Sequence, residues 1–241
     1  MRPLAKWKAG DVLPDGTRIK EHYPANEYGQ ATKALEENFG TYCSYCEQWT
    51  VNVELEHVVP KSQAIQQKSP KLASNWNNFL LACRTCNGPG NKGSQEVQME
   101  DYLWPHLHNT QYAYVYGEGG TATVNPSLPD QEKVKAQNML NLIGLQKTEN
   151  YSQLSGNDRR RLSSRRQDWE QALLKLADYE AGVLKSPEAL AKYARKDCFS
   201  IWYSVFAKHT EVRLALIAIH RGTASHCFDE QGNPIPKLGR T

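Results

Sequence analysis

The chain has 241 residues, of which 39% are hydrophobic and 23% are charged, and its formal net charge at pH 7 is only +3. This composition excludes a disordered chain, because six Trp, twelve Tyr and five Phe residues can bury substantial apolar area. The sequence contains no run of about 18 apolar residues and no secretory signal, so we expect a cytoplasmic protein without a membrane span.

Local patterns predict short elements in the first part of the chain. Residues 1–25 mix Pro, Gly and charged residues and predict an extended segment. Residues 27–39 have the apolar spacing of a helix, which Gly40 is expected to end. Alternating apolar residues predict a strand over 49–55, and the polar residues 61–74 predict a loop.

The pattern changes from strands to helices along the second part. Alternating aromatic residues within 101–126, followed by a Gly-rich stretch, predict a hairpin. Helices are predicted over 129–145, over 157–182 with Leu173 on the buried face, after Ser186-Pro187, and over 197–219. We therefore expect an α+β protein with three parts, which are a lead-in and helix (1–40), a core with a hairpin (41–128) and a helical C-terminal domain (129–241).

Four of the six cysteines form two matched pairs. Cys43 and Cys46 are followed after 36 residues by Cys83 and Cys86. Two Cys-x-x-Cys pairs suit a tetrahedral Zn²⁺ ion with no open coordination position, so we predict a structural zinc site. Two disulfides or a redox motif are the alternatives, and the matched spacing disfavours both. Cys198 and Cys227 stand apart and are expected to be buried, unligated thiols.

The residues between and after these pairs resemble those of the HNH endonucleases. The shared order is Cys-x-x-Cys, then Glu56-His57-x-x-Pro60, then Asn78, then Cys-x-x-Cys-Asn87 with a later Lys92. The resemblance implies a ββα-metal fold that the four cysteines hold through zinc, with a mainly helical C-terminal extension. It also implies that His57 is the general base, that Glu56 and Asn87 bind Mg²⁺ or Mn²⁺, and that Asn78 orients His57 through the backbone.

This chemistry is plausible from the residues as well. A neutral histidine can take a proton from water near pH 7, and a cation held by hard oxygen ligands can stabilise a phosphodiester transition state. Glu56 stands where many family members have Asp, and Glu54 could replace or supplement it, although its spacing fits less well. Gly88-Pro89-Gly90 lengthens the gap before Lys92, which is expected to contact phosphate.

A cluster of arginines marks the predicted helix 157–182. Arg160, Arg161 and Arg165 are interpreted as a track for the nucleic-acid backbone. A solvated face paired with neighbouring acids and an interface with a partner protein are the alternatives. Residues 121–241 carry a formal charge of +5 against −2 for residues 1–120, which is compatible with nucleic-acid binding but is also common on proteins that bind none.

A looser resemblance covers about residues 40–180. Asn75-Trp76-Asn77-Asn78 before the second cysteine pair, Asn125-Pro126 and the helical extension resemble HNH proteins of bacterial anti-phage defence, including the nuclease subunit of Septu-type systems and retron-associated relatives. The resemblance implies an ATPase partner and a bacterial cytoplasmic location.

Three functional hypotheses follow. The chain is a metal-dependent DNA endonuclease, the same site cuts RNA such as tRNA, or the chain is a non-catalytic zinc module that binds nucleic acid or a partner. The presence of Glu56, His57 and Asn87 disfavours the third hypothesis, because a binding module does not need them. Nothing in the sequence separates DNA from RNA.

Overall fold

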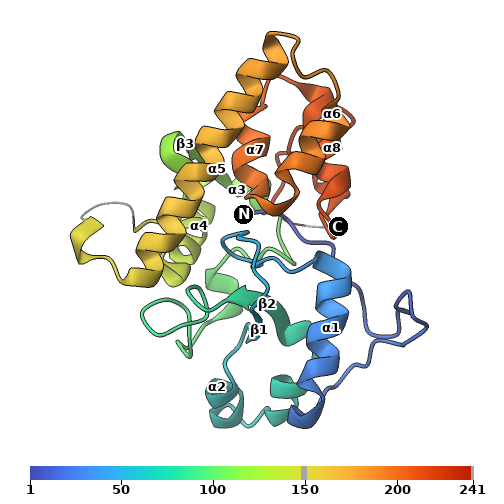
Figure 1. The fold of residues 1–241 in the computed structure, drawn as a ribbon. Helices are drawn as coiled ribbons and strands as arrows, with labels where there is room; N and C mark the ends of the chain where they lie inside the picture. The colour runs from blue at the N-terminus through green and yellow to red at the C-terminus, as the bar shows by residue number, and fades with distance from the viewer. Residues whose placement is uncertain (148–150, 240–241) are drawn as a thin grey trace.

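The computed structural model describes residues 1–147 and 151–239 and confirms a mixed α and β protein with a large helical C-terminal region (Figure 1). Its helices and strands are α1 (Tyr28–Phe39), β1 (Val53–His57), α2 (Lys61–Gln66), β2 (Phe79–Cys83), α3 (Thr110–Ala113), β3 (Tyr114–Gly117), β4 (Thr121–Val124), α4 (Asp130–Ile143), α5 (Gly156–Glu180), α6 (Pro187–Tyr193), α7 (Phe199–Val205) and α8 (Thr210–Ile219).

The antiparallel pair β1–β2 lies at the centre of the N-terminal half. Its register places Val53 opposite Cys83 and His57 opposite Phe79. Every residue of β2 is buried, because α1 packs against the pair and the main core surrounds it (Figure 1). Residues 84–98, which follow β2, are turns and irregular structure.

The expected hairpin is confirmed over a shorter range as β3 and β4. Gly119 and Gly120 turn the chain between the strands with positive φ angles of 66° and 69°. A side chain at Gly120 would also place its Cβ 2.5 Å from the carbonyl oxygen of Arg165, so only glycine lets α5 approach this turn.

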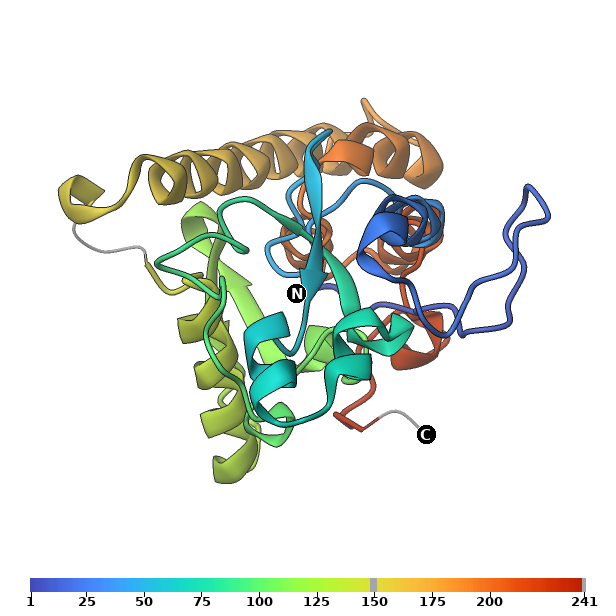
Figure 2. The same cartoon turned by 90° about the horizontal axis from the view of Figure 1, so that it is seen from below.

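The expected C-terminal helices are confirmed as α4 to α8. Gly144 ends α4 in the left-handed conformation, and the side chains of Ser155 and Ser186 cap α5 and α6. Figure 2 shows α5 as a long helix along one side of the molecule, with β1 and β2 on its inner side. A second hydrophobic core joins α5 to α6, α7 and α8.

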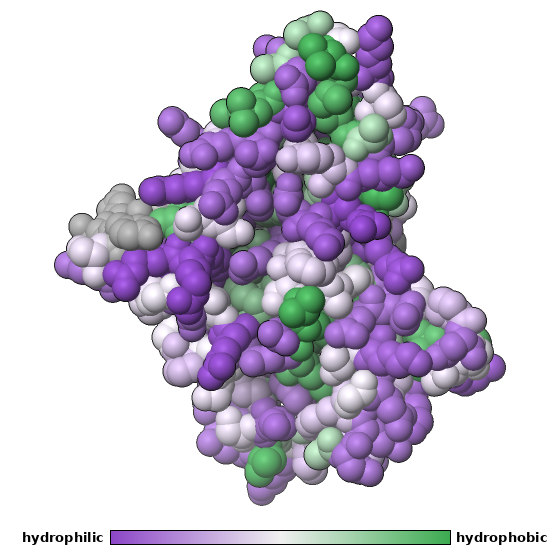
Figure 3. Space-filling model, in the orientation of Figure 1, coloured by the Kyte–Doolittle hydropathy of each residue, from purple (hydrophilic) through white to green (hydrophobic). Residues whose placement is uncertain are grey.

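Several local predictions were wrong. The polar segment 61–74 is mostly helical, with α2 followed by the 3-10 helix Pro70–Ser74. The strand begins at Val53 rather than at residue 49. Leu173 on α5 is 44% exposed, because the core lies against the other face of the helix. Exposed apolar side chains gather at the end of the molecule where α5 leads into α6, while most of the visible surface is polar (Figure 3).

The main hydrophobic core includes residues from each of the three predicted parts. Leu4 and Ile19 come from the lead-in, Phe79 from the core segment, and Met139 and Ile201 from the helical part. The division of the chain into three parts at residues 40 and 128 therefore stays a prediction. Within the described residues, no helix is both long enough and apolar enough to span a membrane.

Candidate active site and zinc clip

The zinc clip consists of Cys43, Cys46, Cys83 and Cys86. All four thiols are buried, and their sulfur atoms lie within 4.8 Å of one another. Cys46 Sγ and Cys83 Sγ are 3.7 Å apart, and a tetrahedral ion with metal–sulfur bonds of about 2.3 Å places its sulfurs about 3.8 Å apart. The residues present therefore fit a structural zinc ion.

Backbone groups support this geometry. The amide of Cys46 donates to Cys43 Sγ and the amide of Cys86 donates to Cys83 Sγ, each at 3.5 Å. These N–H groups stabilise the negative charge of the thiolates that a zinc ion requires. The register of β1 and β2 brings Cys83 opposite Val53, so the clip lies at one end of the pair, whereas Glu56 and His57 lie towards the other.

His57 is the last residue of β1 and is half-buried. Its Nε2 lies 3.0 Å from the carbonyl oxygen of Ala73 and 3.3 Å from the hydroxyl of Tyr28. Because a carbonyl only accepts, Nε2 carries the proton in the neutral ring and Nδ1 carries the free lone pair. Burial, together with the charge of Lys61, lowers the pKa of His57 to about 4, so the ring is neutral at pH 7.

Asn78 holds the chain that follows His57. Its Oδ1 accepts from the amide of Val59 at 2.7 Å, and its Nδ2 donates to the carbonyl of the same residue at 2.9 Å. Its own carbonyl accepts from the amide of Val58 at 2.9 Å. Three hydrogen bonds thus fix the two residues after His57.

Glu56 is 1% exposed and lies on the opposite side of β1 from His57. Its Oε1 accepts from the hydroxyl of Tyr45 at 3.0 Å and from Lys92 Nζ at 2.5 Å. Burial raises the pKa of this carboxyl, although Lys92 and Tyr45 oppose the shift. Both of these contacts are to Oε1.

The assignment of Lys92 to phosphate binding is corrected by the structure. Its side chain is completely buried, and its ammonium group contacts Glu56 and the carbonyl oxygen of His57, the latter at 2.8 Å. A buried lysine paired in this way cannot reach a phosphate in solvent. Lys92 instead contacts two neighbouring residues of β1, Glu56 and His57.

Asn87 follows the second cysteine pair and is held by a bond from its amide to the carbonyl of Cys83 at 2.9 Å. Its Nδ2 donates to Glu54 Oε2, also at 2.9 Å, so its Oδ1 is left as an acceptor. Glu54 is the carboxylate that the sequence spacing ranked second. Because residues two apart on a strand share a face, Glu54 and Glu56 lie on the same side of β1.

A cavity of about 430 Å³, here called the histidine cavity, brings Glu56, His57 and Asn87 together. Sequence reasoning missed several other side chains that line it, among them Tyr28, Lys61, Ser62 and Ser94. Lys61 follows Pro60 directly, and its Nζ lies 5.6 Å from the centre of the Tyr28 ring. Its exposed ammonium places a positive charge at the histidine cavity, where Lys92 does not.

The predicted arginine track is also corrected. Arg161 is 4% exposed and donates to Cys86 Sγ at 3.3 Å and to the carbonyls of Ile143 and Gly144 at 2.7 and 2.6 Å. Arg165 is 5% exposed, and its guanidinium donates to the carbonyl of Gly120.

These two arginines connect α5 to the zinc clip and to the hairpin. Of the three arginines assigned to nucleic acid, only Arg160 is exposed, and it donates to Asn157 Oδ1. A solvated face is therefore wrong for Arg161 and Arg165 as well.

Two comparisons with known proteins bear on this region. Residues 36–92 match the family model described as HNH endonuclease. The chain is also similar to the Septu protein PtuB of Bacillus thuringiensis, with 34% identity over 76 residues. The matched stretch is 30% of this chain and 27% of that protein, so the chain spans about a quarter of the length of the curated relative that it matches.

Proposed function

We propose that this chain, which carries an HNH endonuclease domain at residues 36–92, is a metal-dependent endonuclease that hydrolyses phosphodiester bonds in DNA. The observation that carries the proposal is the histidine cavity, which a neutral histidine, a buried carboxylate and an asparagine line together. A non-catalytic zinc module needs none of these three groups. The zinc clip then has the separate task of holding β1 and β2 in register.

The proposed roles follow from the contacts. Because Nε2 of His57 faces the carbonyl of Ala73, Nδ1 is free to accept a proton from water. Asn78 keeps the ring in place through the backbone of residues 58 and 59. The ammonium of Lys61 lines the same cavity and is placed to offset the charge of a bound phosphate.

The oxygen atoms near His57 suit a hard divalent cation. Asn87 Oδ1 and the carboxylate of Glu56 would hold Mg²⁺ or Mn²⁺, with the Glu54 carboxylate as a further ligand or as the partner that orients Asn87. When bound, the cation supplies charge neutralisation at the phosphate and at the leaving oxygen.

The test uses purified wild-type protein and the variant His57→Ala with plasmid DNA and with RNA, each with Mg²⁺, with Mn²⁺ and with EDTA. Metal-dependent cleavage of DNA that His57→Ala lacks is the expected result. His226→Ala, which removes an exposed histidine, is the matched control and should cleave normally. Cleavage of RNA alone would replace DNA by RNA as the substrate, and cleavage by His57→Ala at the wild-type rate would refute the mechanism.

We further propose that the nuclease acts in bacterial anti-phage defence beside an ATPase partner. The similarity to the Septu protein PtuB supports this proposal. Phage plating on bacteria that express the chain with and without a candidate ATPase partner is the test. Protection that requires both proteins and is lost in His57→Ala is expected, and protection that persists in His57→Ala would exclude the nuclease as the effector.

A further inference from the structure

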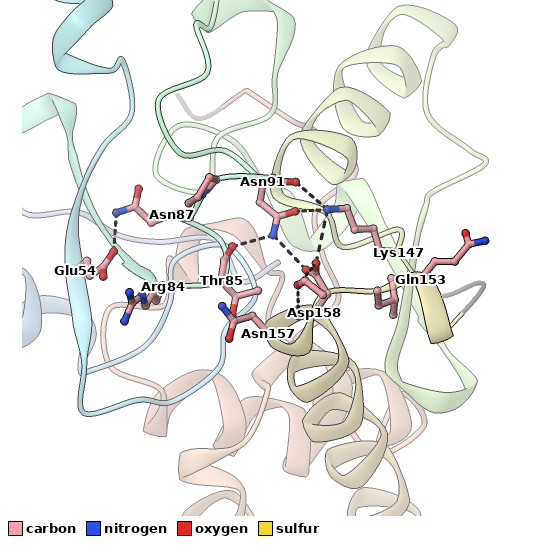
Figure 4. A pocket seen from close by; sticks show the side chains of 14 residues that line it. Glu54, Arg84, Thr85, Asn87, Asn91, Lys147, Gln153, Asn157 and Asp158 are labelled. Carbon is pink, nitrogen blue, oxygen red and sulfur yellow. Dashed lines mark hydrogen bonds and ion pairs between the residues drawn. The ribbon is translucent and has the colours of Figure 1, made fainter.

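A second cavity, of about 660 Å³, lies between the second cysteine pair and the start of α5 (Figure 4). We call it the knuckle cleft and define it by Arg84, Thr85 and Asn87 on one side and by Ser155 and Asn157 on the other. Its volume is large enough for one nucleotide, and polar side chains dominate its lining.

The knuckle cleft adjoins the candidate active site. Asn87 lines both the knuckle cleft and the histidine cavity. Glu54, bonded to Asn87, also lines the cleft (Figure 4). Asn87 therefore separates a cavity suited to the scissile phosphate from a second cavity suited to a flanking group.

The charged groups on the far side of the cleft already have protein partners. Lys147 Nζ donates to Asn91 Oδ1 and to the carbonyl of Gly90, both at 2.8 Å, and lies 3.8 Å from Asp158 Oδ2 (Figure 4). Asp158 also accepts from Ser155, Asn91 and Arg161. Asp158 is thus paired with Arg161 at 3.0 Å and, at a greater distance, with Lys147.

Arg84 is different. It stands between the two ligands of the second cysteine pair, is exposed, and makes no ion pair or hydrogen bond with any residue that the structure describes. A guanidinium has five N–H donors and can bind a phosphate through two parallel hydrogen bonds, so Arg84 is well suited to contact a phosphate beside the candidate active site. The backbone bonds around Cys83 and Cys86 fix its position.

The glycines after Asn87 lie in the lining of the knuckle cleft. Gly88-Pro89-Gly90, which lengthens the gap between Asn87 and Lys92, lines the cleft directly. Gly90 has a φ angle of 92° and no atom within 4 Å of where a Cβ would stand, so it leaves open space beside the chain. The bare backbone here allows a sugar and phosphate to approach closely.

We propose that the knuckle cleft binds the nucleotide that flanks the scissile phosphate, with Arg84 contacting the phosphate of that nucleotide and Asn157 presenting a polar group from α5. The inference rests on the proposed nuclease function and deepens it. It gives the helical extension a direct part in substrate binding, through the first turn of α5 rather than through the buried arginines further along the helix.

The test measures binding without cleavage. In a His57→Ala background, zinc-loaded protein is titrated with a short fluorescein-labelled DNA at several salt concentrations. Arg84→Gln should weaken binding about tenfold and reduce the slope of log affinity against log salt by about one. Asn157→Ala should weaken binding less and leave the slope unchanged. Arg166→Gln, which removes an exposed arginine of α5 outside the cleft, should bind like the parent protein.

Three further measurements decide between outcomes. Zinc content and melting temperature equal to those of the parent show that Arg84→Gln is folded, so that an unchanged affinity and salt slope would overturn the inference. AMP is added as a competitor of DNA binding. If AMP displaces the DNA at concentrations far below those at which simple salt does, the cleft binds a free nucleotide, and this result would also overturn the inference. If wild-type protein cuts DNA while Arg84→Gln binds normally, only the cleft proposal fails, whereas a wild-type protein that neither binds nor cuts any nucleic acid removes the function itself.

Discussion

Lys92 Nζ lies 2.5 Å from Glu56 Oε1, and both side chains are buried next to the histidine cavity, which Glu56 helps to line. The same ammonium donates to the carbonyl of His57. One lysine therefore fixes the carboxylate proposed to hold the cation and the backbone of the proposed base. Burial raises the pKa of the Glu56 carboxyl, and the contact with Lys92 opposes that rise.

Lys92→Met should therefore destabilise the fold and abolish cleavage. Removing one partner of a buried ion pair leaves an uncompensated charge and costs about 3–5 kcal/mol. Urea unfolding measures the loss. The double variant Lys92→Met with Glu56→Gln should recover much of the stability without activity. A Lys92→Met protein as stable as wild type, with only weaker DNA binding, would restore the phosphate role.

Glu54→Gln should raise the Mg²⁺ concentration needed for half-maximal cleavage by about tenfold or more, because Glu54 orients Asn87 or shares its cation. The measurement is a metal titration of cleavage rate. Glu96→Gln, a change of an exposed acid elsewhere, serves as the control. An unchanged metal requirement in Glu54→Gln would leave Glu56 and Asn87 as the only protein ligands proposed.

The sequence was informative where the chemistry is local. Two cysteines three residues apart must turn towards one ion, and the apolar spacing of α1 together with Gly40 is sufficient to predict that helix. Contacts between residues far apart in the sequence could not be predicted in this way. The sequence shows that Lys92 follows Asn87, but it does not show that the Lys92 ammonium donates to the carbonyl oxygen of His57.

Arginines show the same limit. Arg161 and Arg165 were correctly expected on a helix, and they were interpreted as surface residues because arginine is seldom buried. The carbonyls of Ile143, Gly144 and Gly120 at the ends of α4 and in the hairpin accept their donors, and these acceptors exist only in the folded chain. Residues 61–74 are mostly helical although most of their side chains are exposed, so they lack the apolar spacing that would have predicted a helix.

Arg161→Met should weaken zinc binding by about 10–100-fold, because the guanidinium donates to Cys86 Sγ and offsets the negative charge of four thiolates. Competition with a coloured chelator measures zinc affinity. Arg160→Met, a change of the exposed neighbour, should retain the wild-type affinity. Equal zinc affinity in the two variants would show that Arg161 only joins α5 to α4.

Asp168→Asn should stabilise the protein in a manner that grows with pH. Asp168 lies on α5 and accepts from the amide of Cys198 at 2.9 Å, and burial raises its pKa to about 7 from an ordinary value of 3.8. Between these values the folded state keeps a proton that the unfolded state has lost, so the free energy of unfolding falls as pH rises through this window, and the cost is complete above pH 7. An asparagine keeps the acceptor without the charge.

Urea unfolding at pH 5 and pH 8 should show that the advantage of Asp168→Asn over wild type in the free energy of unfolding increases by about 2 kcal/mol. Glu170→Gln removes an exposed charge from the same helix and should show no such increase. An advantage of Asp168→Asn that is the same at both pH values would mean that the carboxyl titrates as it does in water.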